Sequence, residues 1–434
     1  MASDRVVLIG EGDLADETEE ALKAIGADVT RLEEPSDDDV EEVLKKGTAH
    51  VAIVSRHDAY VLRMALMVRY VDDEVPLLVT VFEPPIAEGI SDSISNCTIS
   101  SMADIVAPSL AGPCLSDDLV AVNLEADPPA GIRETDDGVE EVALVLPKRK
   151  RVRGALRALL QPYDKSAVLL LLGAFGLLGI LLIETFSAML VLGQGFVDAL
   201  YGAGKTLVTV DPNQEVDDGP KAFKVFITFT MLVALVLEVC FTAGLVNRLI
   251  DRRLTGIVGR NVVPRRDHVV VVGMGQVGLR LCLALRRCGI GVVAVDNEEE
   301  GAHVSFARDV GLPVVIGRGA DPALLRSLTL KHARALAAVT DDDLQNISIA
   351  MAAKAVNPDL RIVVRAGDGK LANETRSLFR IGLVRDVHRI AAALLAAQVT
   401  GAASTDTRVV CRDDDAHLLH ADGRLEPAKF GPAG

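Results

Sequence analysis

Residues 269–278 read Val-Val-Val-Val-Gly-Met-Gly-Gln-Val-Gly, a short apolar run that leads into a glycine-rich turn. A second apolar run follows at 292–295 and ends at Asp296. An apolar strand, a glycine turn, a helix and a second strand ending in an acid together form the βαβ unit of an open parallel sheet. These residues therefore predict an α/β domain.

The turn has the spacing Gly-x-Gly-x-x-Gly, the fingerprint of Rossmann-type nucleotide-binding domains. Gly273 permits the tight turn, Gly275 lets a pyrophosphate approach the backbone, and Gly278 lets the helix pack closely on the strand. The N-terminus of that helix then faces the phosphates. Asp296 would accept hydrogen bonds from ribose hydroxyls and disfavour a 2′-phosphate, so NAD(H) fits better than NADP, and ATP or ADP remains an alternative.

A second copy of this pattern lies near the N-terminus. Residues 6–9 are apolar, Gly10-Glu-Gly12-Asp-Leu-Ala15 follows, and Glu33 occupies the place of the acid. One offset of 263 residues carries Gly10, Gly12, Ala15, Gly26 and Glu33 onto Gly273, Gly275, Gly278, Gly289 and Asp296. Because chance rarely keeps five positions in register, the sequence predicts two related Rossmann-type domains with parallel sheets covered by helices.

Composition limits the classes of function. The formal net charge of the 434 residues is -16, and most of the excess acid lies before Pro147, which makes nucleic acid an unexpected partner. The six cysteines show neither paired metal spacing nor a disulfide framework, as in reduced cytosolic domains. We find no nucleophile paired with a base and no metal cluster, so we expect no catalytic residues, no metal site and no enzyme.

Two long apolar runs separate the fingerprints. Residues 167–192 and 225–246 are each long enough to cross a bilayer as a helix. Basic residues precede the first run and follow the second, which predicts that both termini face the cytoplasm. The N-terminus has no basic segment followed by a short apolar one, so no cleavable signal peptide is expected. We expect a two-pass protein of the cell membrane.

The segment between the two runs resembles the pore loop of two-span potassium channels. Residues 195–205 have apolar positions at helical spacing, and Thr206-Leu-Val-Thr209-Val210-Asp211-Pro212-Asn213 follows. The resemblance covers about residues 166–255 and implies a re-entrant helix at 195–213, a monovalent cation pathway and a homotetramer. It departs from the family at the filter, where Asp211-Pro212-Asn213 stands in place of Gly-Tyr-Gly.

The departure affects the expected chemistry of the loop. A filter of stacked carbonyls needs dihedral angles that glycine permits, whereas proline restricts itself and the residue before it. We expect Thr209, Val210, Asp211 and Glu238 to line an ion pathway, with Asp211 as a ring of charge in a weakly selective pore. The alternative is an extracellular connection on a membrane anchor. Glu184 lies nearer to a helix end than Glu238, which is therefore the stronger intramembrane candidate.

The sequence after the second fingerprint alternates short strands with alanine-rich helices, and residues 267–398 resemble the regulator-of-potassium-conductance domain, also called the TrkA N-terminal domain. Gly317 with Asp321, the Thr340-Asp341-Asp342 run with Asn346, and Arg365 follow in family order. The resemblance implies nucleotide contacts at Gly273, Gly275, Gln276, Val277, Gly278, Asp296, Gly317, Thr340, Asp341 and Arg365. Arg318 departs from the family, which commonly has an acid after this glycine.

The first copy departs further from the fingerprint. Glu11 and Asp13 lie beside the helix N-terminus that would receive a phosphate, and their charges repel one. An offset of 285 residues places Val61 at the position of Asn346 and Thr80 at that of Arg365. We therefore expect a structural or dimerising role for the first domain.

Four segments are expected. They are a degenerate Rossmann domain at 1–147, a transmembrane segment at 148–260, a nucleotide-binding domain at 267–398 and a short tail at 399–434. We expect a nucleotide-regulated membrane cation channel or potassium-transport protein. The alternative is a membrane-anchored, nucleotide-sensing regulatory subunit of a separate potassium transporter, and a membrane dehydrogenase is a third hypothesis.

Overall fold

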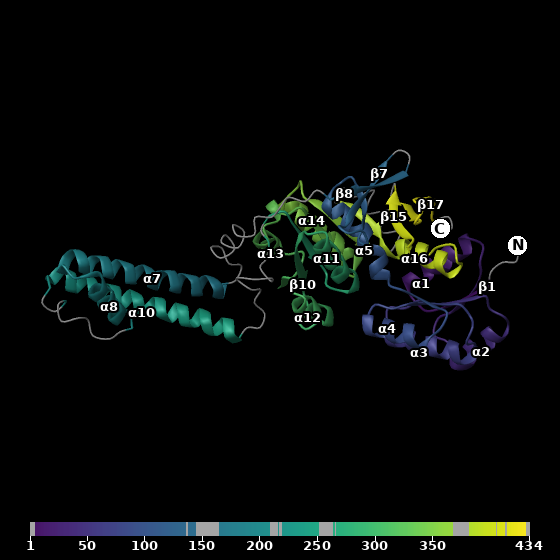
Figure 1. Ribbon diagram of the computed structural model, residues 1–434, viewed down its shortest axis with the longest axis horizontal. Coiled ribbons are helices and arrows are strands. Elements are labelled where there is room, and N and C mark those ends of the chain that lie inside the picture. The colour runs from purple at the N-terminus through teal and green to yellow at the C-terminus, as the bar shows by residue number, and fades with distance from the viewer. Residues whose placement is uncertain are drawn as a thin grey trace. The chain divides into compact units, whose positions relative to one another are not determined.

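The computed structural model describes residues 5–135, 138–144, 165–208, 216, 219–250, 264, 266–367, 382–404, 406–412 and 415–430 (Figure 1). The chain divides into two compact units. Met1–Arg149 and Val263–Gly434 form an α/β unit, and Lys150–Val262 form a helical unit.

The first half of the α/β unit is a five-stranded parallel sheet in the order β2-β1-β3-β4-β5. Its strands are β1 (Arg5–Ile9), β2 (Asp28–Leu32), β3 (His50–Ile53), β4 (Leu77–Thr80) and β5 (Cys97–Ser100). Its helices are α1 (Asp13–Ala24), α2 (Asp37–Lys45), α3 (Asp58–Val71) and α4 (Pro84–Ser93). The central strands are almost wholly buried, as expected when helices cover both faces of a sheet.

The second half repeats this arrangement with six parallel strands in the order β11-β10-β9-β12-β13-β14. The strands are β9 (His268–Val272), β10 (Gly291–Asp296), β11 (Val314–Ile316), β12 (Ala335–Ala338), β13 (Arg361–Ala366) and β14 (Leu383–Asp386). The helices are α11 (Gln276–Arg287), α12 (Ala302–Asp309), α13 (Pro322–Ser327), the 3-10 helix η1 (Leu330–His332) and α14 (Asp343–Val356). The predicted fold class is confirmed.

Equivalent side chains perform the same local task in both halves. Asp58 at the start of α3 accepts hydrogen bonds from the amides of Phe82 and Glu83, just after β4. Asp343 at the start of α14 accepts from the amide of Gly367, just after β13, at 2.8 and 3.0 Å. Each carboxylate ties a helix N-terminus to the end of the neighbouring strand, which supports the internal repeat.

The two halves exchange their last helices. Helix α5 (Met102–Leu115) follows the first sheet but packs on α11, β12 and β13 of the second half. Helix α16 (Val387–Val399) follows the second sheet but packs on α1, β3 and β4 of the first half (Figure 1). Their buried apolar side chains join both sheets into a shared core. The halves therefore form one folded body rather than two separable domains.

Two small antiparallel sheets complete this unit. One contains β6 (Leu119–Asn123), β7 (Ala130–Thr135) and β8 (Gly138–Ala143), and the other contains β15 (Arg408–Arg412), β16 (Asp415–Leu419) and β17 (Leu425–Pro427). They share an apolar cluster that includes Val120, Ile132 and Val410. Within 399–434, where we expected a short tail, apolar alternation lets the strands pair as a meander that packs on the first small sheet.

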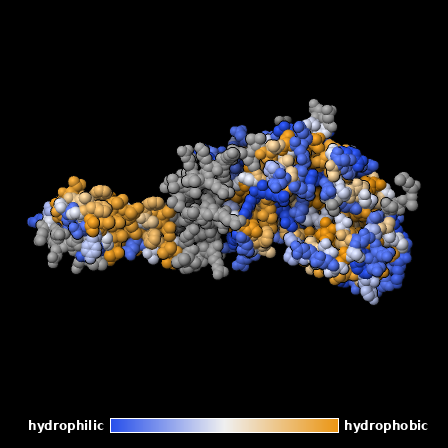
Figure 2. Space-filling view, viewed as in Figure 1, coloured by the Kyte–Doolittle hydropathy of each residue, from blue (hydrophilic) through white to orange (hydrophobic). Residues whose placement is uncertain are grey.

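The helical unit contains α7 (Lys165–Leu192), α8 (Phe196–Leu207) and α10 (Lys221–Ile250). Leu169–Leu192 and Lys221–Val246 are long and apolar enough to cross a membrane. Most of their surface is exposed in the single chain, and Figure 2 shows it as hydrophobic. A Cβ added to Gly173 would lie 2.6 Å from Cβ of Phe241, so a small residue lets α7 and α10 approach closely, as is common between membrane helices.

Candidate functional site

The second glycine turn is tightly packed at Gly273 and Gly278 and open at Gly275. Gly273 has φ +100°, and a Cβ there would lie 2.7 Å from the Thr340 amide nitrogen. A Cβ on Gly278 would lie 1.8 Å from the Gly273 carbonyl oxygen, so both positions require glycine. A Cβ on Gly275, the N-cap of α11, would meet nothing within 4 Å. The turn therefore leaves room for a ligand in front of the helix N-terminus.

Asp296, at the end of β10, is hydrogen-bonded to the backbone of this turn. Its Oδ2 accepts a hydrogen bond from the Met274 amide at 2.6 Å, and its Oδ1 accepts one from the Glu298 amide at 2.8 Å. The Gly317 amide donates to the Asp296 carbonyl at 2.7 Å, which sets the loop after β11 beside the carboxylate. Carboxylate oxygens keep further acceptor capacity after one bond each, so Asp296 can still accept hydroxyl donors.

Asn346 organises the neighbouring strand ends. It is fully buried, and its Oδ1 accepts from the Thr340 amide at 2.9 Å and from the Thr340 hydroxyl at 2.7 Å. Its Nδ2 donates to the carbonyls of Thr340 and Arg365 at 3.0 and 3.1 Å. This one amide therefore fixes the ends of β12 and β13 next to the glycine turn.

Arg365 is the most unusual charged group of the site. Only 6% of its surface is exposed, and its Nε has no hydrogen-bond partner within the described part of the chain. Burial, followed by repulsion from Arg56, lowers the pKa of Arg365 to about 10, although Asp343 and Asp341 act in the opposite direction. A buried guanidinium under these conditions marks a place where a counter-charge would be stabilised.

The first half reaches into this region through Arg56. The Arg56 carbonyl accepts a hydrogen bond from Gln276 Nε2 at 3.4 Å, and Arg56 Nη2 lies 3.1 Å from His388 Nε2. His388 Nδ1 lies 2.8 Å from the Gly367 carbonyl, and burial lowers the pKa of His388. Sequence reasoning missed Arg56 and His388, since they approach the site across the shared core. The 285 offset, which aligns Arg56 with Asp341, was the available signal.

The remaining predicted contacts are also placed. Val277 is buried behind the turn, whereas Gln276 begins α11 and Asp341 is exposed after β12. The structure thus brings the fingerprint glycines, Thr340 and Arg365 together, with Asp296 on the other side of the turn. Thr209, Val210 and Asp211 lie outside the described residues. Among the described residues, no group of three or more potential ligands is placed to hold a metal ion.

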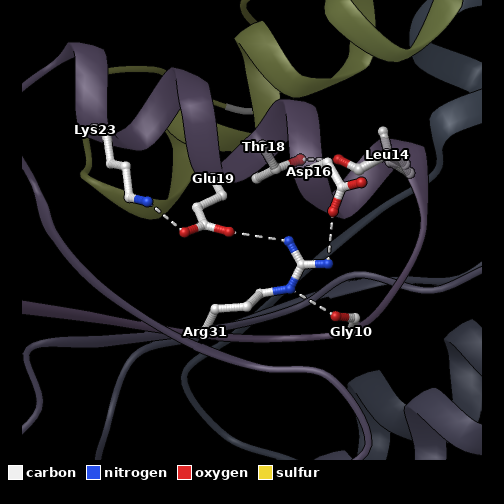
Figure 3. A network of polar contacts seen from close by, with 7 residues as sticks. All are labelled: Gly10, Leu14, Asp16, Thr18, Glu19, Lys23 and Arg31. Atoms are coloured by element: carbon white, nitrogen blue, oxygen red, sulfur yellow. Dashed lines mark hydrogen bonds and ion pairs between the residues drawn. The ribbon is translucent and has the colours of Figure 1, made fainter. Parts of the chain in front are cut away.

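The first glycine turn is tied down by its own side chains (Figure 3). Arg31 on β2 donates from Nε to the Gly10 carbonyl at 2.8 Å and pairs with Asp16 at 2.9 Å and Glu19 at 3.2 Å. The Arg31 side chain is only 11% exposed. The matching position in the second half, by the 263 offset, is Ala294. A guanidinium therefore braces the first turn where the second turn has only a methyl group.

Glu184 is a buried acid among the described residues of the helical unit. Only 2% of Glu184 is exposed, and its two carboxylate oxygens accept hydrogen bonds from the hydroxyls of Thr206 on α8 and Thr230 on α10. Glu238 lies on the exposed side of α10 in the single chain. Distance from a helix end does not specify which face of the helix packs inward, and the role of Glu238 in an ion pathway stays a prediction.

A glycine turn at the end of one parallel strand, facing an acid at the end of the next, defines a Rossmann-type nucleotide-binding domain. Residues 269–382 match the family model described as the TrkA-N domain, so the chain contains a TrkA-N (RCK) domain, and the predicted resemblance is confirmed.

Similar proteins include potassium channels. The chain is 26% identical over 203 residues to "Potassium channel protein 1" of Methanocaldococcus jannaschii. This alignment covers 45% of this chain and 60% of that protein. It is also 25% identical over 114 residues to "Voltage-gated potassium channel Kch" of Escherichia coli. That alignment covers 26% of this chain and 27% of that protein. The chain therefore spans less than two thirds of these relatives.

Solved structures of one channel share the fold over nearly the whole chain. The structure titled "GsuK Channel" has a TM-score of 0.52 at 16% identity and covers 95% of this chain and 67% of that one. The structure titled "GsuK channel bound to NAD" has a TM-score of 0.50 at 15% identity, with the same coverage. Both titles describe a channel.

Proposed function

We propose that this protein is a membrane cation channel or potassium-transport protein whose conduction is regulated by NAD(H) or an adenine nucleotide bound at the second glycine turn. Its relatives carry the names of potassium channels, and a protein of the same fold is titled as bound to NAD. The observation that carries the proposal is the empty space before Gly275 at the N-terminus of α11, within a chain that also has two membrane-length helices.

The proposed contacts divide the nucleotide among three groups. The amides of Gly273–Gly278 and the α11 N-terminus face the phosphates, with Gln276 at the first turn of the helix. Asp296, beside Gly317, accepts the ribose hydroxyls. Thr340, Asp341 and Arg365 face the far end of the ligand.

Regulation requires different affinities in two states. A ligand moves a two-state equilibrium from 1:99 to 99:1 only if it binds one state more tightly by about 5.5 kcal/mol. In a homotetramer with one site in each chain, each site needs to supply only about a quarter of that difference. Two spans and one loop supply a quarter of a pore, so the proposal includes a tetramer with both termini in the cytoplasm.

We assign the ion pathway to Thr209, Val210 and Asp211 together with Glu238, which is exposed on α10. One observation favours the second candidate function, a membrane-anchored regulator of a separate potassium transporter. This is the sequence Asp211-Pro212, which replaces the glycine that a carbonyl-lined filter needs.

The test is ion flux through purified protein in liposomes, with K⁺ compared with Na⁺ in the presence and absence of NAD⁺, NADH and ADP. Gly275→Asp places a carboxylate in the phosphate space. Gly301→Asp is the matched control, because Gly301 is the N-cap of α12 in the same domain and has ordinary space around it. Flux that responds to a nucleotide in the wild type and the control, but not in Gly275→Asp, supports the proposal. Nucleotide binding without flux would favour the anchored regulator.

A further inference from the structure

Two arginines and a histidine gather where the two halves of the α/β unit meet. Arg365 comes from β13, His388 from the first turn of α16, and Arg56 from the loop between β3 and α3. Arg56 Nη2 lies 3.1 Å from His388 Nε2, and Arg56 is the charged group that acts most strongly on Arg365. Two guanidinium groups thus face one region of the molecule.

Arg365 has an unpartnered nitrogen among the described residues. Only 6% of the residue is exposed, and its Nε has no hydrogen-bond partner there. Asp343 is close but is engaged with the Gly367 amide through both oxygens. Asp341 is exposed to solvent. A buried cation beside a second cation favours an anionic ligand.

The cluster lies at one end of the proposed nucleotide site. Gln276, the first residue of α11, donates to the Arg56 carbonyl, so Arg56 lies beside the N-terminus that faces the phosphates. Asp296 lies on the other side of the glycine turn, where it binds the Met274 amide. A ligand whose ribose contacts Asp296 and whose phosphates face Gly275 would therefore extend toward Arg56 and Arg365.

We propose that Arg56 of the first half and Arg365 of the second together bind the terminal phosphate of a nucleoside diphosphate such as ADP. This inference rests on the proposed function, and it adds that the first half contributes directly to the ligand site of the second. A dinucleotide such as NAD⁺ has no terminal phosphate, so it offers Arg56 no group to bind, whereas Arg365 can face the far end of either ligand. A bound diphosphate would bridge the two halves.

Asp13 of the first half is the built-in competitor. Its Oδ2 lies 3.8 Å from His388 Nδ1, its side chain is 72% exposed, and it contributes to the field at Arg365. Its carboxylate offers Arg365 a weak, solvent-exposed counter-charge. A phosphate with more charge and more acceptor oxygens displaces this interaction, so removing the carboxylate should favour binding.

The experiment is calorimetric titration of the full chain in detergent with ADP, NAD⁺ and inorganic phosphate. Arg56→Gln should weaken ADP binding by about tenfold, since a charge-assisted hydrogen bond is lost, and change NAD⁺ binding by less than about twofold. Asp13→Asn should tighten ADP binding by about threefold, with the size expected for an exposed charge. Arg63→Gln is the matched control, because Arg63 is an exposed arginine of the first half that pairs with Asp37.

The outcomes separate this inference from the proposed function. Unchanged ADP affinity in Arg56→Gln, with binding lost in Gly275→Asp, overturns the role of Arg56 and leaves the nucleotide site intact. If Arg56→Gln weakens the binding of ADP and NAD⁺ equally, that role is also overturned. The arginine would then support the structure of the site rather than bind a terminal phosphate. Inorganic phosphate that binds as tightly as ADP, and does so through Arg56, overturns the assignment to a nucleotide. Full binding of ADP and NAD⁺ by Gly275→Asp rejects the proposed function itself.

Discussion

Gly275 and Gly278 of the second glycine turn should respond differently when each is replaced by alanine. In Gly278→Ala the new Cβ would lie 1.8 Å from the Gly273 carbonyl oxygen, which is backbone and cannot rotate away. In Gly275→Ala the new Cβ meets nothing within 4 Å, and the backbone φ of -74° suits alanine. The first substitution therefore disturbs the folded protein, whereas the second changes only the space offered to a ligand.

The magnitudes follow from these contacts. Forcing a methyl group into a packed contact costs about 1–3 kcal/mol, and a backbone contact this short places Gly278→Ala at the upper end. For an α/β unit of this size, whose unfolding entropy is large, that lowers the midpoint of thermal unfolding by about 4–5 °C. For Gly275→Ala, the gain of about 0.4–1 kcal/mol from restricting the unfolded chain roughly offsets the poorer helix cap. Its stability should stay within about 1 kcal/mol of the wild type.

The assay is thermal unfolding of the full chain in detergent, followed by circular dichroism, together with nucleotide titration at 25 °C. We expect Gly275→Ala to unfold with the wild type but to bind ADP and NAD⁺ at least about tenfold more weakly, because the methyl group occupies the phosphate space. Gly301→Ala, at the N-cap of α12, is the control and should match the wild type in both measurements.

Two results would refute this reasoning. Wild-type stability of Gly278→Ala would mean that the close contact with Gly273 does not exist in solution. A Gly275→Ala protein that binds nucleotide normally would mean that the open space before α11 does not receive the phosphates.

Three further predictions concern buried or half-buried polar groups. Asn346→Ala should destabilise the α/β unit by about 2–4 kcal/mol, measured by chemical denaturation, because it leaves several buried backbone groups without partners. Burial and nearby Asp386 raise the pKa of Glu17 to about 7. As the pH rises from about 4.5 to 7, the carboxyl loses its proton in the unfolded state first, so the stability of the folded protein should fall. Glu17→Gln should flatten this pH dependence of the thermal unfolding midpoint. Glu184→Ala should increase amide exchange in α8, since two interhelical hydrogen bonds of about 0.6–2 kcal/mol each are lost. Glu238→Ala is the control and should leave that exchange unchanged.

The sheets were predictable from the sequence because the fingerprint is a local pattern. The apolar run before Gly273, the turn and the acid at Asp296 lie within about thirty residues and specify a βαβ unit through neighbouring contacts. The strands that follow have similar local signals. The fold class and the TrkA-N domain were predicted for this reason.

The exchange of α5 and α16 was not predictable in the same way. Both helices are apolar on nearly every face because each is enclosed by both halves, so their sequence specifies burial but not the partner. Arg56 and His388 were missed for the same reason, since they come together only after the exchange.

The last small sheet did leave a signal that the sequence interpretation missed. Asp422-Gly423 lies between the runs that form β16 and β17, and Gly423 has φ +83°. An Asp-Gly pair between apolar runs is a strong indication of a hairpin. The short length of the segment led to the expectation of a tail instead.

The helix exchange also changes how the pairing of the two halves depends on conditions. Subunits of an ordinary dimer separate on dilution, whereas halves of one chain meet at an effective concentration set by the connection between them. Removing the first half would take α5 away from α11, and removing the second half would take α16 away from α1. The pairing of the two halves therefore does not depend on protein concentration. It also does not require a ligand at the acidic glycine turn of the first half.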